Sequence, residues 1–248
     1  MKRQALLIAN PGETGASNYC EGVNRDCEAY PQYLRAPFGG LWYGSEIEVL
    51  KRPNTVEVRL AMQKVKAADY GLVIFAGHGY YSQTKKTTML ELRKGEEIDS
   101  LDLRAGAGKQ TLILDCCRKI EAATTRDMVF AEAMRKSASM TPDQCRYYYD
   151  REIQRCSSGL VLLWACAVGQ TAGDDGARGG YYSSSLLEGA EDWAKNSNVD
   201  TSRNISVLRI VTAHETAAAQ VSRRSGGRQT PSIEKPRSEP YFPFGIVA

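Results

Sequence analysis

Two apolar stretches of the sequence end in residues that could perform chemistry, a histidine and a cysteine. His78 follows residues 70–76 and has a glycine on each side, and Cys117 follows residues 110–115. An imidazole can remove the proton of a thiol or protonate a leaving amine, and a thiolate can attack a carbonyl carbon. The pair indicates nucleophilic catalysis, although a histidine at a strand end is, on its own, more often a polar residue with satisfied hydrogen bonds.

The elements that would position this pair are strands of one sheet. Short apolar runs alternate with helical patterns, which predicts an α/β fold, a three-layer α/β/α sandwich with a mostly parallel central sheet. The expected strands are residues 4–9, 46–50, 70–76, 110–115 and 159–166. The carboxyl ends of parallel strands share one edge of a sheet, so we expect His78 and Cys117 on the same rim. The backbone amides of Gly79 and Cys117 could bind the oxyanion that develops there.

The remaining segments are predicted from helical period and composition. Apolar residues recur at helical spacing over residues 56–66 and 205–221, and a proline-containing cap signature starts a helix over residues 142–156. Residues 222–240 are rich in Ser, Arg, Gly and Pro, which predicts a surface loop or flexible arm. Residues 241–247 predict a terminal strand that rejoins the sheet. His214 would then be a partly buried residue in the middle of a helix.

The composition describes one soluble domain. The chain has 248 residues, a mass of 27.3 kDa and 42% hydrophobic residues, enough for a sizeable core. The small net charge of +3 does not indicate a basic face across the domain, so we expect no nucleic-acid partner. The longest apolar run, residues 159–169, is shorter than the roughly 20 residues of a membrane helix, and residues 1–10 lack the hydrophobic region of a secretory signal. We therefore expect no membrane partner.

Cysteine usage points to a reducing compartment. The chain has seven cysteines, an odd number, with no C-x-x-C pair and two histidines. Free thiols fit this pattern better than a disulfide framework or a structural zinc site. The expected location is the cytoplasm, with no metal and no cofactor.

Several short motifs give the sequence a resemblance to a known family. Residues 76–79 (Ala-Gly-His-Gly) followed by residues 115–118 (Asp-Cys-Cys-Arg) resemble the His and Cys elements of the caspase superfamily of cysteine peptidases, paracaspases most closely and metacaspases next. The likeness extends over residues 4–195. Its other elements are a first strand at residues 5–9, a following turn at residues 22–26, residues 164–172, and Gly179-Gly180 entering a helix.

The resemblance implies a role for each matching residue. Cys117 is the nucleophile of a Cys-His dyad and His78 its general base and acid, while Cys116 has a packing role. The substrate pocket is expected to contain Asp26, Asp115 and Ala76.

The charge of that pocket predicts its specificity. Caspases that cut after Asp have Gln where Asp115 stands here. Two carboxylates would repel each other in an empty pocket, and a guanidinium would relieve this while donating paired hydrogen bonds. We therefore expect protein or peptide substrates with Arg, or secondarily Lys, before the scissile bond. The alternative for Asp26 is a helix N-cap, and for Asp115 a solvated strand end.

Other residues near the expected rim are less specific. Cys166, Gln170 and Asp174 are candidates for the pocket rim. Asp174 and its neighbour Asp175 could bind calcium, as in some metacaspases, but the spacing of a calcium-binding loop is missing and loop residues are the simpler interpretation. Tyrosines at 80–81 and 147–149 could wall the substrate groove or stack on a planar activator, with a packing cluster as the default.

The resemblance also divides the single domain of residues 1–248. Residues 1–117 correspond to a large subunit, residues 159–248 to a small subunit with the loop at 222–240, and residues 118–158 to a helical linker. An Arg-directed enzyme could cut its own linker, although an exposed basic helix face explains the same arginines. The arginines concerned are Arg126, Arg135, Arg146, Arg151 and Arg155.

These observations predict a caspase-like cysteine endopeptidase. Its size leaves no room for a further domain, which suggests a stand-alone bacterial enzyme, activated by a small molecule or a protein, that acts in stress, cell-death or antiviral defence. The alternative is a non-catalytic scaffold of caspase fold that binds a signal ligand or peptide. A cysteine phosphatase is disfavoured, because its phosphate loop needs an arginine where Ala122 and Ala123 stand.

Overall fold

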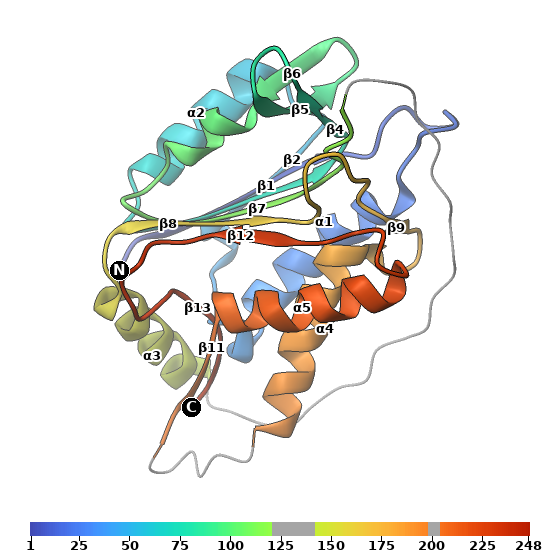
Figure 1. Cartoon of the computed structure of the whole chain (residues 1–248). Coiled ribbons are helices and arrows are strands. Elements are labelled where there is room, and N and C mark those ends of the chain that lie inside the picture. The colour runs from blue at the N-terminus through green and yellow to red at the C-terminus, as the bar shows by residue number, and fades with distance from the viewer. Residues whose placement is uncertain (121–141, 198–203) are drawn as a thin grey trace.

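A six-stranded sheet forms the centre of the molecule in the computed structural model, which describes residues 1–120, 142–197 and 204–248 (Figure 1). The strand order is β12-β8-β7-β3-β1-β2. The strands are β1 (Arg3–Asn10), β2 (Ile47–Lys51), β3 (Tyr70–Gly77), β7 (Lys109–Cys116), β8 (Gly159–Trp164) and β12 (Ser232–Glu234). All neighbours pair in parallel except the edge strand β12, which runs antiparallel to β8. The five strands expected from the sequence are confirmed.

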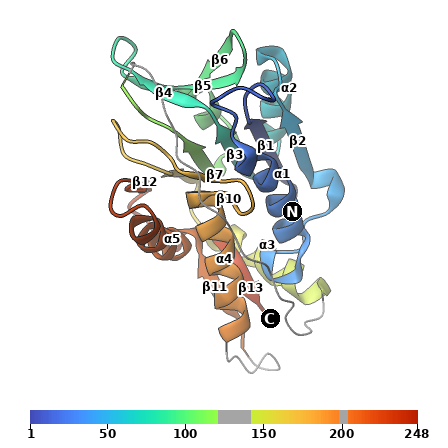
Figure 2. The same ribbon diagram turned by 90° about the vertical axis from the view of Figure 1, so that its right-hand side faces the viewer.

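Helices and a smaller sheet cover the two faces of this central sheet (Figures 1 and 2). One face carries α1 (Glu21–Arg35), α4 (Tyr181–Asn196) and α5 (Ile210–Arg224). The other carries α2 (Thr55–Lys66), the antiparallel strands β4 (Gly79–Ser82), β5 (Thr87–Arg93) and β6 (Glu96–Asp99), and the 3-10 helix η3 (Ser100–Arg104). Two further 3-10 turns are η1 (Pro37–Gly39) and η2 (Gly44–Glu46). The predicted three-layer arrangement is confirmed.

Side-chain alternation along the strands divides the core into two layers. In β1, Ala5 and Leu7 are buried on the face of α1, whereas Leu6 and Ile8 are buried on the face of α2. Successive residues of a strand point to opposite faces, so an uninterrupted apolar run is what a doubly covered strand requires. This is why the central strands could be predicted from short apolar runs.

The start of α2 could be predicted from a local capping motif. The side chain of Asn54 accepts a hydrogen bond from the Glu57 amide at 2.8 Å, and the Glu57 carboxylate accepts one from the Asn54 amide at 2.7 Å. Such a reciprocal capping box satisfies two amides that the first helical turn leaves without partners. The predicted helix over residues 56–66 is thereby confirmed.

The predictions for residues 205–221 and 241–247 need correction. A helix was expected over the whole first segment, but residues 206–209 form β11 (Ser206–Arg209), and α5 begins only at Ile210. Strand β11 pairs antiparallel with β13 (Pro243–Val247) in a separate two-stranded sheet, so the terminal strand does not rejoin the central sheet. Pairing of residues 206–209 with the buried strand β13 outweighs the helical spacing of their apolar residues.

The segment 222–240 is also more ordered than predicted. It contains β12, whose residues pair with the end of β8. The Glu234 carboxylate accepts hydrogen bonds from the Trp164 indole and the Arg104 guanidinium at 3.0 Å each. Three residues in a Ser-, Gly- and Pro-rich context give no strand signal, because this strand depends on its sheet partner rather than on its own composition.

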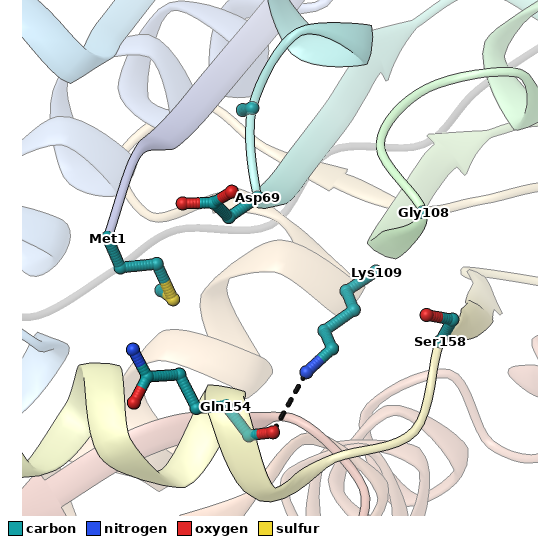
Figure 3. A pocket seen from close by; sticks show the side chains of 7 residues that line it. Met1, Asp69, Gly108, Lys109, Gln154 and Ser158 are labelled. Atoms are coloured by element: carbon teal, nitrogen blue, oxygen red, sulfur yellow. Dashed lines mark hydrogen bonds between the residues drawn. The ribbon is translucent and has the colours of Figure 1, made fainter.

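Helix α3 (Pro142–Arg155), which was predicted as residues 142–156, closes the amino ends of the strands. The ammonium of Lys109, at the start of β7, donates to the carbonyls of Ile153 and Gln154 at 2.9 and 3.0 Å. Figure 3 shows the cavity beside this contact, with a volume of about 490 Å³, lined by Met1, Asp69, Gly108, Lys109, Gln154 and Ser158 among others. It lies at the amino ends of the strands, opposite the predicted rim.

No helix among the described residues is long and apolar enough to cross a membrane.

His214 generates a stability prediction. It is 4% exposed on α5, and its Nδ1 lies 2.7 Å from the Tyr182 hydroxyl. Burial lowers the pKa of His214 from 6.5 to about 4, so the folded state holds the neutral imidazole. The resulting stability is fully present above pH 6.5 and is lost as the pH falls toward 4. We expect wild type to lose about 2 kcal/mol more than His214→Asn between pH 7 and pH 5.

Urea unfolding of both proteins at the two pH values measures this difference. Parallel pH dependence in the two proteins would show that His214 does not contribute.

Candidate active site

The carboxyl ends of β3 and β7 bring His78 and Cys117 to one edge of the sheet. Gly77 of β3 and Cys116 of β7 are the last residues paired in the parallel register. His78 and Cys117 are the next residues of the two adjacent strands. The predicted common rim is therefore the carboxyl edge of these strands.

Glycines on both sides of His78 allow the chain to turn there. Gly77 has φ +150°, and a Cβ on it would lie 2.4 Å from the Asn10 carbonyl oxygen. A Cβ on Gly79 would lie 3.0 Å from the Cys116 sulfur and 2.9 Å from the Met89 carbonyl oxygen. Only glycine fits such close backbone approaches. The Gly-His-Gly motif is thus the junction at which β3 passes directly into β4.

Cys117 is held by the turn that follows β8. Its side chain is 8% exposed, and its sulfur lies 3.8 Å from the Ala172 carbonyl oxygen. The next residue is fixed as well: the Arg118 amide donates to the Gln170 carbonyl at 2.9 Å, and its guanidinium lies 3.8 Å from the centre of the Trp164 ring. These contacts therefore fix the main chain around Cys117.

The other cysteines near this edge are packing residues. Cys116 points to the opposite face of the sheet from Cys117 and is fully buried, and burial raises the pKa of its thiol. Cys166 is also fully buried, and its thiol donates to the Cys116 carbonyl at 3.3 Å; burial raises its pKa to about 12. Neither is suited to form a thiolate nucleophile. Cys166 lies beneath the surface and does not line a rim.

The two predicted pocket acids lie close together. Asp26 on α1 is 1% exposed and Asp115 on β7 is 5% exposed. Burial raises the pKa of Asp26 well above its usual value, and the charges of Asp115 and Asp174 raise it further. Asp26 lies inside α1, which begins at Glu21, so it is not the N-cap considered as an alternative. Residues 22–26, expected as a turn, are also part of this helix.

Each acid is bound by the main chain around the start of α4. Asp26 Oδ2 accepts a hydrogen bond from the Gly180 amide at 3.2 Å, while Asp26 Oδ1 is buried without a hydrogen-bond partner among the described residues. Asp115 Oδ2 accepts from the Ser183 amide at 3.0 Å and from its hydroxyl at 2.7 Å. The Tyr30 hydroxyl donates in turn to the Ser183 hydroxyl at 3.2 Å.

A glycine pair covers the acids. Strands β9 (Asp174–Asp175) and β10 (Gly179–Gly180) form a short antiparallel hairpin before α4. A Cβ on Gly179 would lie 2.2 Å from Asp26 Oδ1, and one on Gly180 would lie 2.3 Å from Asp115 Oδ2. The backbone can approach the two carboxylates only because these residues have no side chains.

Three other predicted site residues take up supporting positions. Asp174 Oδ2 accepts from the Gly22 amide at 3.1 Å, which ties the hairpin to α1. Gln170 Oε1 accepts from the Thr230 amide at 2.8 Å and stabilises the turn after β8. Ala76 is 1% exposed and packs in the core beside Asp115, its register partner, so it does not form an open pocket wall.

The tyrosines at 147–149 do not lie near this edge. They belong to α3, at the amino ends of the strands, where the buried Tyr149 donates to the Pro243 carbonyl at 2.9 Å. The proposal that they wall the groove was wrong, because α3 packs against β13 and not against the site. Tyr80 is on β4, directly after the Gly-His-Gly junction, and its hydroxyl donates to Glu97 at 2.8 Å.

Nothing in the part of the chain that the structure describes groups three or more His, Cys, Asp or Glu side chains in a way that could hold a metal ion. The Asp175 carboxylate accepts hydrogen bonds from the amides of Ala177 and Arg178 instead, at 3.0 and 3.3 Å.

Comparisons with known proteins identify the family and the fold. A family model described as a caspase domain matches residues 2–242. The chain belongs to the caspase-domain family of cysteine peptidases. This caspase-family chain is also similar in fold to the crystal structure of caspase-1 from Spodoptera frugiperda, with a TM-score of 0.57, 14% identity, and coverage of 94% of this chain and 87% of that one. No curated protein matches the sequence.

Two further residues contribute hydrogen bonds to the candidate site. Tyr30 and Ser183 were not singled out, although Ser183 supplies two of the hydrogen bonds to Asp115. The signal available was the run Gly-Gly-Tyr-Tyr-Ser at residues 179–183, where glycines precede a helix that starts with polar residues.

Ser183 therefore has a testable structural role. Replacing Ser183 by Ala removes a hydrogen bond to a buried carboxylate, which should lower the free energy of unfolding by about 1–3 kcal/mol. Urea unfolding measures the loss. Ser197, at the end of α4, whose hydroxyl donates to the Trp193 carbonyl at 2.8 Å, provides the control. A Ser197→Ala loss as large as that of Ser183→Ala would contradict a special role for the Asp115 contact.

Proposed function

We propose that this caspase-family chain is a cysteine endopeptidase that cleaves proteins after Arg, with Lys second. The observation that carries the proposal is the buried acid pair, Asp26 and Asp115, beside the nucleophile strand, with Asp26 Oδ1 lacking a hydrogen-bond partner among the described residues. A buried carboxylate oxygen of this kind is costly unless a cation pairs with it. A substrate guanidinium would supply the missing charge and donors.

In the proposed reaction, His78 removes the proton from the Cys117 thiol, and the sulfur attacks the carbonyl carbon of the scissile bond. The amides of Gly79 and Cys117 bind the oxyanion. His78 then gives the proton to the leaving amine as the C–N bond breaks, which leaves a thioester on Cys117. Water, activated by His78, hydrolyses the thioester and restores the thiol.

Specificity for Arg would come from replacing a main-chain hydrogen-bond donor of Asp26 by the guanidinium of the substrate. In the present structure the Gly180 amide occupies Asp26 Oδ2, so a bound guanidinium would take the place of this main-chain donor. A planar guanidinium can reach two carboxylates with paired hydrogen bonds, whereas an ammonium presents a compact charge. Arg is therefore preferred to Lys, and the like charge of an Asp substrate is rejected.

Regulation and biological role are proposed from the family resemblance. We place the protein in the cytoplasm as an effector of bacterial stress, cell-death or antiviral defence, switched on by a small molecule or a protein. If the linker is cut by the enzyme itself, Arg126 and Arg135, which lie outside the described residues, are the candidates. Arg146, Arg151 and Arg155 belong to α3, and a helix must unfold before its backbone can enter a protease site.

A substrate panel tests this function. Fluorogenic peptides with Arg, Lys or Asp before the scissile bond should be cleaved in the order Arg, then Lys, with Asp resistant, and Cys117→Ala should abolish all cleavage. Asp26→Asn and Asp115→Asn should each lower kcat/KM on the Arg peptide by at least about 30-fold, because losing a buried charge partner costs about 2–5 kcal/mol. The exposed Asp102→Asn is the matched control and should behave as wild type.

Two results would reject the proposal. Faster cleavage of the Asp peptide would overturn the pocket assignment, and tight binding of Arg peptides without cleavage of any would favour a non-catalytic scaffold. Urea unfolding of each variant verifies that lost activity does not reflect lost folding, and the mass of the incubated chain reports cleavage at the linker.

A further inference from the structure

The imidazole of His78 rests against the loop that joins β1 to α1. The sulfur of Cys20 lies 3.7 Å from His78 Nε2 and 4.0 Å from Nδ1. The sulfur is therefore in contact with the ring at similar distances from its two nitrogens. Cys20 is 1% exposed and occupies the N-cap position of α1, so it is a fixed wall of the space around the ring.

Gly12 forms a second wall. Its φ is +92°, and a Cβ on it would lie 2.9 Å from His78 Nε2. The backbone of Gly12 therefore touches the imidazole so closely that no side chain fits between them. The loop presents bare backbone to Nε2 at Gly12 and a sulfur atom to the ring at Cys20.

This loop is anchored to the same strands that carry His78. The side chain of Asn10 accepts from the Gly12 amide at 3.1 Å and donates to the Glu91 carbonyl at 2.9 Å, while the Glu91 amide donates to the His78 carbonyl at 3.0 Å. At the other end of the loop, the Cys20 amide donates to the Pro11 carbonyl at 2.7 Å. These hydrogen bonds link the loop to the His78 backbone through Asn10 and Glu91.

We propose that Gly12 and Cys20 are positioning residues, which hold the His78 imidazole in the orientation it needs to exchange a proton with Cys117. The inference rests on the proposed Cys117–His78 pair but not on the identity of the substrate. Cys20 is not itself a second nucleophile: it is buried, and its thiol donates to the Asn18 carbonyl at 3.4 Å. Its part is to fill the space beside the ring.

The same loop contains a matched control for Gly12. Gly15 has φ +83°, close to that of Gly12, but a Cβ on Gly15 would have no atom within 4 Å. Both Gly→Ala substitutions therefore impose similar backbone strain, and only Gly12→Ala also pushes against the imidazole. A difference between the two variants isolates the contact with His78.

The experiment measures alkylation of Cys117 by iodoacetamide in the full chain. The Cys117 sulfur forms a bond to the reagent carbon, iodide leaves, and the thiol proton passes to His78. Peptide mass spectrometry quantifies labelling at Cys117 separately from the other cysteines across a pH series. Titratable and charged groups near the pair include Cys20, Cys116, Cys166, Asp115 and Arg118, and of these only Cys20 is altered in any variant.

We expect Gly12→Ala to lower the rate of Cys117 labelling at neutral pH by about tenfold or more, since small misplacements of a reacting group have large effects. The pH profile should shift in the same direction as in His78→Ala, and Gly15→Ala should match wild type. Cys20→Ala, which leaves the ring room to turn, should also shift the profile while circular dichroism remains native. If Gly12→Ala fails to fold, Cys20→Ala still tests the inference.

The inference is overturned if Gly12→Ala, correctly folded, labels like Gly15→Ala, if Cys20→Ala labels like wild type, or if Cys20 is alkylated in place of Cys117. Identical labelling of wild type and His78→Ala also overturns it, because no pair would exist to position. If wild type cleaves no peptide of the panel but labelling of Cys117 still depends on His78, Gly12 and Cys20, the inference stands and the proposed peptidase function is rejected.

Discussion

The parallel register between β3 and β7 is the constraint on which the site depends. Because Gly77 and Cys116 are paired, the next residue of each strand leaves the sheet at the same level. A shift of one residue in β7 would send Cys117 to the face that now holds Cys116. Backbone hydrogen bonds between two fully buried strands thus determine where an imidazole and a thiol can meet, and the flanking glycines allow the chain to diverge there.

The acid pair adds an electrostatic constraint to this geometry. Asp26 comes from α1 and Asp115 from β7, and both are withdrawn from water. Burial and the charge of Asp115 both raise the pKa of Asp26, and hydrogen bonds from Gly180 and Ser183 orient the two carboxyl groups. The start of α4 therefore supports the acid pair directly, and the caspase-domain match over residues 2–242 spans all of these elements.

Much of the fold could be predicted because central strands buried on both faces need continuous apolar runs, and because Asn54 and Glu57 mark the start of α2. The edge strand β12 and strand β11 could not be predicted, since each depends on a partner strand distant in sequence. The same holds at the site. His78 and Cys117 could be predicted because each follows an apolar run. The contact of Cys20 with His78 could not, because it depends on how the loop between β1 and α1 folds back.

The two ends of the central sheet are stabilised differently. At the amino ends, the buried guanidinium of Arg3 donates to the carbonyls of Gly40 and Leu41, pairs with Asp150 at 3.4 Å and lies 4.5 Å from the Trp42 ring centre. At the carboxyl ends, loops and a glycine hairpin surround the reactive groups. Loops on a rigid scaffold tolerate change better than packed elements. This division allows the loops at the carboxyl ends to change in sequence during evolution, while the packing around Arg3 preserves the folded framework.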